Sequence, residues 1–255
     1  MSHGRRRPIQ IGWLLASITR QPLIASLDFY CLIASQLQMA GCSTYVLTEK
    51  EFTANANQLI SISNSIGDNW QLHHFKDGDV DCYLSKRLTK DLKLSPSYEG
   101  ESVLDLEEEN EVEDDVNTLS TASVGELCTF EYHVMYSSSY AAPVLYFTAY
   151  WQDGHLLSLE DLWASLSKIY QCRLRADRWT FVTQQEHPVL HRPFYQLHPC
   201  KTGLLMALMR ECKDTQSSHG DGIIRNMLVS WLSTVGPVVH LDIPVQYGIS
   251  IQDHK

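Results

Sequence analysis

Two neighbouring β-type segments constrain the fold of this chain more than any other feature. The first, CTFEYHVMYS at 128–137, alternates apolar and polar residues, and the second, PVLYFTAYW at 143–151, is apolar along nearly its whole length. Alternation with a period of two is typical of a strand with one face in the core, whereas a continuous apolar run indicates a strand buried on both faces. The two segments therefore predict a half-exposed strand beside a buried one.

Helix signals stand on both sides of these strands. Thr48 and Ser158 each begin a capping-box pattern, with an acidic residue at the third helical position, ahead of an amphipathic run. Two further helical runs follow at 201–212 and 221–239, and the second is stopped by a Gly-Pro pair. We expect helices to begin and to end the folded region.

The remaining β signals are shorter. WQLHHF at 70–75 and VDCYLSKRL at 80–88, separated by the turn signal Asp77-Gly78-Asp79, predict a β-hairpin. Between 177 and 200, Pro188 and Pro193 interrupt β-type residues, so we expect an irregular segment that leads into a short strand ending near His198. The order of elements predicts an α+β fold, with an antiparallel meander sheet flanked by helices.

Length and charge favour one domain with an insertion. The chain has 255 residues, 44% of them hydrophobic, which is enough for one sizeable core. The net charge of −10 argues against a nucleic-acid partner, but ten acidic residues lie in 98–116 alone. We expect the domain to span 39–250, with a disordered acidic insertion at 97–124.

Residues 1–38 are expected to be an extension outside the fold. They carry Arg and Ser with no acidic residue before Asp28, as a mitochondrial transit peptide would, and a short secretory signal is the other alternative. Met39, however, is followed by a well-formed helix start. Seven cysteines without a CxxC pair indicate reduced thiols, and no apolar run is long enough to span a bilayer, so we expect a cytoplasmic protein.

Cys200, in the phrase FYQLHPCKTGLLM, has four possible roles. With His187, His191 and His198 it could bind zinc, but their spacing matches no common structural zinc pattern. A disulfide to Cys212 has no secretory signal or cysteine framework to support it. A buried structural cysteine and a nucleophile both remain open, because a strand end followed by a helix start offers amide donors that favour a thiolate.

Longer phrases around Cys200 resemble a known family. They are, in chain order, IGDNWQ (66–71), EYHV (131–134), YSSSYAAPVLYF (136–147), DGHLLSLEDLW (153–163), QQEHPVLHRPFY (184–195), HPCKT (198–202) and WLSTVGPVV (231–239). Together they resemble the autophagy E2-like conjugating enzymes, the autophagy-related protein ten family, across residues 39–250.

The resemblance implies a modified E2 ubiquitin-conjugating fold and a cysteine thioester on Cys200. In this family the cargo is the ubiquitin-like autophagy protein twelve, the donor is the E1-like autophagy protein seven, and the acceptor is a lysine of autophagy protein five. The second autophagy ubiquitin-like modifier is a further partner that the resemblance admits. It also implies a transferase that serves autophagosome formation. We expect no cofactor, no metal and no membrane span.

The sequence departs from ordinary E2 enzymes beside the cysteine. Those enzymes place His-Pro-Asn several residues before the cysteine, whereas Cys200 itself follows His-Pro, so the group that stabilises the oxyanion is unassigned. Gln184, Gln185 and the backbone amides after Cys200 are candidates, with an exposed loop position as the alternative for both glutamines.

Three other side chains are candidates near the cysteine. His198 either shapes the turn or assists thiolate formation and proton removal. Tyr132 and His133 are candidates for the acceptor side, although alternating aromatics in a strand also pack in cores.

Two alternative functions remain. The sister E2-like enzyme of lipid conjugation also uses His-Pro-Cys, but its pattern lacks the continuation from KTG to WLSTVGPVV. A noncatalytic E2-like binding module would hold a ubiquitin-like partner without chemistry, and the retained Cys200 argues against it.

Overall fold

A computed structural model of the chain describes residues 44–75, 82–94, 126–166, 182–216 and 226–249. The predicted extension at 1–38, the acidic insertion at 97–124 and the Asp77–Asp79 turn lie outside these residues.

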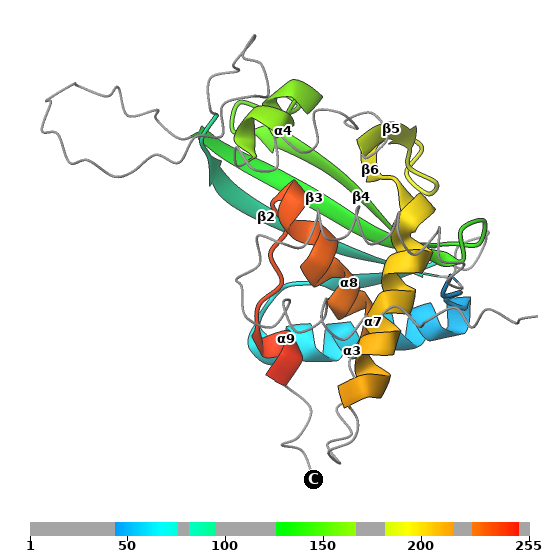
Figure 1. Ribbon diagram of the computed structural model, residues 1–255. Helices are drawn as coiled ribbons and strands as arrows, with labels where there is room; N and C mark the ends of the chain where they lie inside the picture. The colour runs from blue at the N-terminus through cyan, green and yellow to red at the C-terminus, as the bar shows by residue number, and fades with distance from the viewer. Residues whose placement is uncertain (1–43, 76–81, 95–125, 167–181, 217–225, 250–255) are drawn as a thin grey trace, which may run out of the picture.

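The described residues form one antiparallel sheet with its main helices against one face (Figure 1). The strands are β1 (Gln71–His74), β2 (Cys82–Leu92), β3 (Glu126–Ser137), β4 (Ala142–Trp151), β5 (Val182–Glu186) and β6 (Pro193–Leu197). The helices are α3 (Glu49–Ile66), α4 (Leu159–Ser165), α7 (Thr202–Gln216), α8 (Met227–Val235) and α9 (Gln246–Ile249), with 3-10 turns η1 (Pro199–Lys201) and η2 (Gly236–Val239). The predicted α+β class is confirmed.

The last two strands depart from the predicted meander. The sheet order is β1-β2-β3-β4-β6-β5, so β6 pairs with β4 and β5 forms the edge. The prediction of an irregular segment missed β5, because it read Pro188 and Pro193 as interruptions of β structure. Pro193 is instead the first residue of β6, a position where a strand tolerates proline, and Pro188 lies in the connection between the strands.

The helix starts follow the predicted capping chemistry. Thr48 Oγ1 accepts from the backbone amide of Glu51 at 3.2 Å, and the Glu51 carboxylate accepts from the amide of Thr48 at 2.8 Å. Ser158 and Asp161 repeat this box at the start of α4. Gly67 ends α3 at a φ of 70°, where a side chain would be strained.

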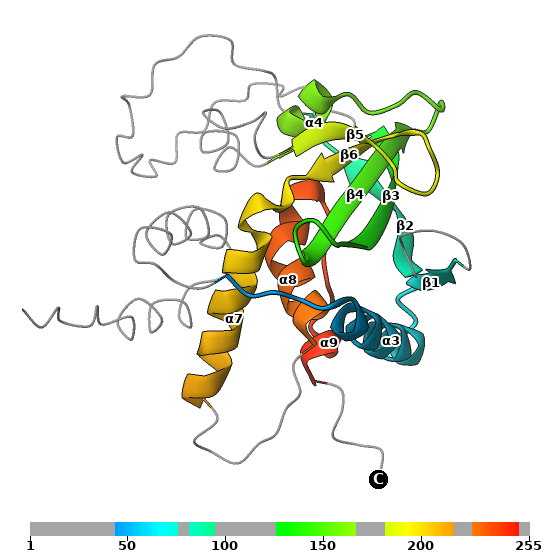
Figure 2. The same cartoon turned by 90° about the vertical axis from the view of Figure 1, so that its right-hand side faces the viewer.

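The main core lies between the sheet and helices α3, α7 and α8 (Figure 2). Helix α8 supplies Leu228, Trp231 and Leu232, all buried, which agrees with the apolar stripe read from its sequence. No helix within the described part of the chain is both long and apolar enough to cross a membrane.

The opposite, outer face of the sheet is covered as well. Glu131, His133 and Met135, which alternate with the core residues of β3, are only 8%, 2% and 2% exposed. A second apolar cluster lies there, formed by Tyr83, Met135, Val144, Tyr146 and Phe194, with Val189 and Leu190 packed against it. The prediction that 128–137 is half-exposed is therefore wrong, because the loop between β5 and β6 folds back over this face.

Candidate active site

Cys200 lies at the junction of a strand and a helix. Strand β6 ends at Leu197, η1 carries Cys200, and α7 begins at Thr202. The Cys200 side chain is exposed, whereas Cys82 and Cys128 are buried. Exposure removes the buried structural cysteine from the alternatives, because such a residue has no contact with solvent.

His198 holds the backbone of Cys200 in place. Its Nδ1 accepts a hydrogen bond from the amide of Cys200 at 3.2 Å, and its backbone is extended, with φ −64° and ψ 123°, as at the start of a helix. An acceptor nitrogen carries no proton in a neutral imidazole, so the proton is on Nε2. The predicted turn-shaping contact is therefore present, and the second nitrogen of the ring is a donor.

Tyr140 packs on His198 from the turn between β3 and β4. The two ring centroids are 6.1 Å apart, with the rings at 76° to each other, and Tyr140 is 48% exposed. Strand β6 runs antiparallel to β4, so the end of β6 lies beside the start of β4 and this turn. The local sequence pattern assigned no role to Tyr140. The signal that could have found it is this antiparallel pairing, which needs the order of the strands.

A segment that precedes α3, residues 44–47, lies against the same site, and we call it the strap. The amide of Tyr45 donates to the carbonyl of Gly203 at 2.9 Å, and the amide of Leu47 donates to the carbonyl of Ala141 at 2.8 Å. The strap therefore links the first turn of α7 to the turn that carries Tyr140. Nothing in its own sequence indicated this role.

Gln184 and Gln185 lie on the edge strand β5. They are exposed and stand opposite Tyr195 and Phe194, whereas Val182 is the residue opposite Leu197, nearer to Cys200. Gln184 also lines a surface pocket of about 440 Å³ together with Ser158, Leu159 and Glu160. Both glutamines are exposed, as the alternative reading held, but they are on a strand rather than in a loop.

Tyr132 belongs to the core. Its side chain is fully buried, its ring stacks on Phe130, and its hydroxyl donates to the carbonyl of Val239 at 2.6 Å. Burial raises the pKa of the hydroxyl, with the Asp242 carboxylate as a lesser cause. The prediction that Tyr132 lines the acceptor side is corrected, because a buried side chain with a bonded hydroxyl cannot contact an incoming lysine.

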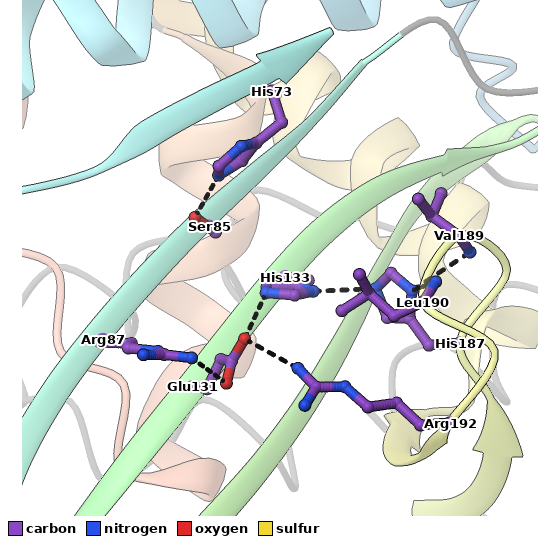
Figure 3. A network of polar contacts seen from close by, with 9 residues as sticks. All are labelled: His73, Ser85, Arg87, Glu131, His133, His187, Val189, Leu190 and Arg192. Atoms are coloured by element: carbon purple, nitrogen blue, oxygen red, sulfur yellow. Dashed lines mark hydrogen bonds and ion pairs between the residues drawn. The ribbon is translucent and has the colours of Figure 1, made fainter. Parts of the chain in front are cut away.

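His133 lies on the outer face, inside a polar chain that Figure 3 shows. Its Nδ1 is 2.8 Å from Nε2 of His187, and its Nε2 is 3.1 Å from Oε1 of Glu131. The other oxygen of Glu131 accepts from Arg87 at 2.9 Å, and Arg192 lies 3.5 Å from Oε1. His133 is thus buried among fixed partners, and the acceptor-side prediction is corrected for it too.

The backbone amides that bond to His187 fix the hydrogen-bond directions along this polar chain. Nδ1 of His187 accepts from the amides of Val189 at 3.2 Å and Leu190 at 3.1 Å, so its proton is on Nε2 and is donated to His133. His133 in turn donates through Nε2 to Glu131. These hydrogen bonds link the loop after β5 to strand β3 of the sheet.

Burial and these bonds shift two pKa values. Burial lowers the pKa of His187 to about 4, with His133 and Arg192 as lesser causes. The hydrogen bond from His133, followed by the contact with Arg87, lowers the pKa of Glu131 to about 2 against the effect of burial. At neutral pH His187 is therefore an uncharged imidazole, with its one proton on Nε2, and Glu131 is a carboxylate.

Comparison with known proteins gives one consistent family. Residues 51–246 match the family model described as the autophagocytosis associated protein, active-site domain. The chain is 40% identical over 208 residues to the human ubiquitin-like-conjugating enzyme ATG10, across 78% of this chain and 91% of the human protein. It is 41% identical over 120 residues to the protein of the same name from Arabidopsis thaliana, across 46% of this chain and 51% of that protein. The Dictyostelium discoideum protein of that name is 35% identical over 119 residues.

Proposed function

Because this chain belongs to the ATG10 family of ubiquitin-like-conjugating enzymes, we propose that Cys200 is the residue that carries the modifier as a thioester. The chain is an E2-like conjugating transferase of autophagy. Its cargo is the ubiquitin-like autophagy protein twelve, received from the E1-like autophagy protein seven. The acceptor is a lysine of autophagy protein five, which becomes joined through an isopeptide bond.

The observation that carries this proposal is the position of Cys200. An exposed thiol stands just before the amino terminus of a 15-residue helix, whose dipole stabilises negative charge nearby. A thiol that takes part in this relay must be accessible to two successive protein partners, and Cys200 is exposed. A cysteine suits this relay, because a thioester stays activated and a thiolate is a good leaving group.

The reaction proceeds in two acyl transfers. The Cys200 thiolate first attacks the carbonyl carbon of the thioester on the E1-like enzyme, and the cysteine thiolate of that enzyme leaves. A neutral lysine amine then attacks the new thioester, so that a C–N bond forms, the C–S bond to Cys200 breaks and the amine loses a proton. Each attack places negative charge on the carbonyl oxygen, which needs a hydrogen-bond donor.

His198 supplies that donor in this proposal. Its Nδ1 is engaged with the amide of Cys200, which leaves the Nε2 proton to be donated toward the oxyanion. The amide of Thr202 already donates to the carbonyl of Pro199, so it is not a free donor. His198 thus takes the place of the asparagine in ordinary E2 enzymes, with Tyr140 packed on its ring.

Reconstituted conjugation tests the proposed cargo and acceptor. The chain, the E1-like partner, the ubiquitin-like cargo, ATP and autophagy protein five are combined, and the products are separated by mass. We expect a cargo–acceptor conjugate that resists reducing agent and requires Cys200. A product linked to phosphatidylethanolamine, with none on the acceptor protein, would instead favour the lipid-conjugating alternative.

A further inference from the structure

The strap lies close against α7 beside Cys200. Figure 2 shows it as the blue segment that passes from α7 to the start of α3. A Cβ atom added to Gly203 would lie 3.0 Å from the carbonyl oxygen of Tyr45 and 3.6 Å from Cβ of Thr44. The first distance is shorter than ordinary contact, so a side chain at residue 203 would require the strap to shift by a few tenths of an ångström.

The other end of the strap is anchored just as firmly. Leu47 is fully buried, its amide donates to Ala141 at 2.8 Å, and its carbonyl accepts from the hydroxyl of Tyr136 at 2.9 Å. Ala141 has a φ of 46°, a left-handed conformation that is uncommon for alanine. The anchor therefore holds the turn that carries Tyr140 in a conformation that the residue itself does not favour.

The side chain of Tyr45 adds a third attachment. The guanidinium of Arg210, on α7, lies 5.3 Å from the centre of the Tyr45 ring, and the Tyr45 hydroxyl lies 3.4 Å from Oε1 of Glu51. A cation over an aromatic face is attractive, so the ring fixes the strap along the helix. The strap is thus joined to α7, to α3 and to the turn after β3.

We propose that the strap is a positioning element for lysine transfer, which sets the place of Cys200 relative to Tyr140 and His198. Gly203 and Tyr45 are its positioning residues. This inference rests on the proposed function, since it names how that same site is held together. Cys200 and Tyr140 belong to segments far apart in sequence, and the strap bonds to both. Because misplacing reacting groups by an ångström can slow a reaction roughly a hundredfold, such a link has direct consequences for rate.

The test compares Gly203→Ala with Gly248→Ala. A Cβ at Gly248 would meet nothing within 4 Å, so this variant controls for the exchange itself. Alanine is the better helix former at position 203, and the added methyl should therefore displace the strap without unfolding α7. Tyr45→Ala removes the ring that contacts Arg210, and Tyr45→Phe keeps it.

Two readouts are measured for each variant. The first is the rate at which a preformed thioester is discharged by free lysine, which needs no acceptor protein. We expect Gly203→Ala and Tyr45→Ala to discharge roughly tenfold more slowly, and Gly248→Ala and Tyr45→Phe to match the wild type. The second is the pH profile of Cys200 alkylation by iodoacetamide in the free chain, which we expect to shift only in the first pair.

These outcomes separate the inference from the proposed function. If the wild type forms no thioester, the proposed function fails, and the alkylation profile still decides the role of the strap. If folded Gly203→Ala and Tyr45→Ala proteins match the wild type in discharge and alkylation, the strap does not position Cys200. Equal slowing in Tyr45→Phe and Tyr45→Ala would also overturn it, because the ring contact would then be irrelevant.

Discussion

The ring of Tyr140 stands edge-on to the ring of His198, with centroids 6.1 Å apart. The first side chain comes from the turn after β3 and the second from the end of β6. Since His198 also accepts from the amide of Cys200, an aromatic contact and a hydrogen bond together fix one imidazole beside the thiol. Both contacts can be removed separately, which makes their roles open to measurement.

Replacing Tyr140 tests the aromatic contact. We expect Tyr140→Ala to slow transfer from a preformed thioester to lysine by roughly tenfold, because an unsupported imidazole samples other rotamers. Tyr140→Phe keeps the ring and should retain most of the rate. Single-turnover discharge measures both, and a loss in the Phe variant as large as in the Ala variant would show that the hydroxyl, and not the ring contact, matters.

Three replacements of His198 separate its two roles: the acceptor of the Cys200 amide and the proposed donor to the oxyanion. Asn and Asp can both accept from the amide of Cys200, but only Asn also has N–H donors. We therefore expect His198→Asn to transfer at near the wild-type rate. His198→Asp should fold normally yet lose roughly a hundredfold in rate, as enzymes do when one oxyanion donor is removed. His198→Ala loses both contacts, and equal rates in the Asn and Asp variants would exclude a donor role.

Local sequence signals predicted much of this fold. The capping boxes at Thr48 and Ser158, the β1–β2 pairing and the two long strands depend on residues close together in the chain, and the structure confirms them. The α+β class followed from their order. The assignment of Cys200 as the thioester carrier, which stays a prediction, came from its neighbours, through the phrases that resemble the family.

Contacts between distant segments were not predictable in the same way. Tyr132 and His133 are adjacent in sequence, and only the coverage of both sheet faces shows that each is buried. The strap carries no pattern of its own, because its bonds to Gly203 and Ala141 are made by backbone amides. The position of β5 at the sheet edge depends on which strand β4 pairs with, and local pattern does not specify that.

The buried hydrogen-bonded residues His187, His133 and Glu131 predict that the free energy of unfolding falls as the pH is lowered. The pKa of His187 is 6.5 in the unfolded chain and about 4 in the folded protein, so the unfolded state binds more protons between these values. Its contribution is complete above pH 6.5 and is lost as the pH falls toward 4. Glu131, with a pKa lowered from 4.5 to about 2, extends the loss from pH 4.5 downward.

Urea unfolding at a series of pH values measures this effect. We expect His187→Asn to reduce the proton uptake on unfolding between pH 6.5 and 4 by about one proton. His155→Asn, at an exposed position, is the control and should keep the wild-type slope. His240, a half-buried histidine whose pKa burial lowers to about 4, keeps part of the slope in both variants. An unchanged slope in His187→Asn would contradict the account.

The left-handed conformation of Ala141 predicts a stabilising substitution. Glycine adopts a φ of 46° without the steric cost that alanine bears, so we expect Ala141→Gly to raise the free energy of unfolding by about 0.5–1 kcal/mol. Asn69→Gly, at a φ of 53°, is the matched control and should change the free energy of unfolding less, because asparagine already tolerates this region. Chemical denaturation of both variants checks it, and a clear loss of stability in Ala141→Gly would refute the prediction.

The thioester on Cys200 is the central claim, and mass spectrometry of the charged protein tests it most directly. The purified chain is incubated with the E1-like enzyme, the ubiquitin-like cargo and ATP, and the attachment site is mapped. We predict an adduct on Cys200 that reducing agent removes, a Cys200→Ser adduct that resists it, and no adduct on Cys200→Ala. A charged Cys200→Ala chain, or an adduct mapped to another residue of the wild type, would contradict the account.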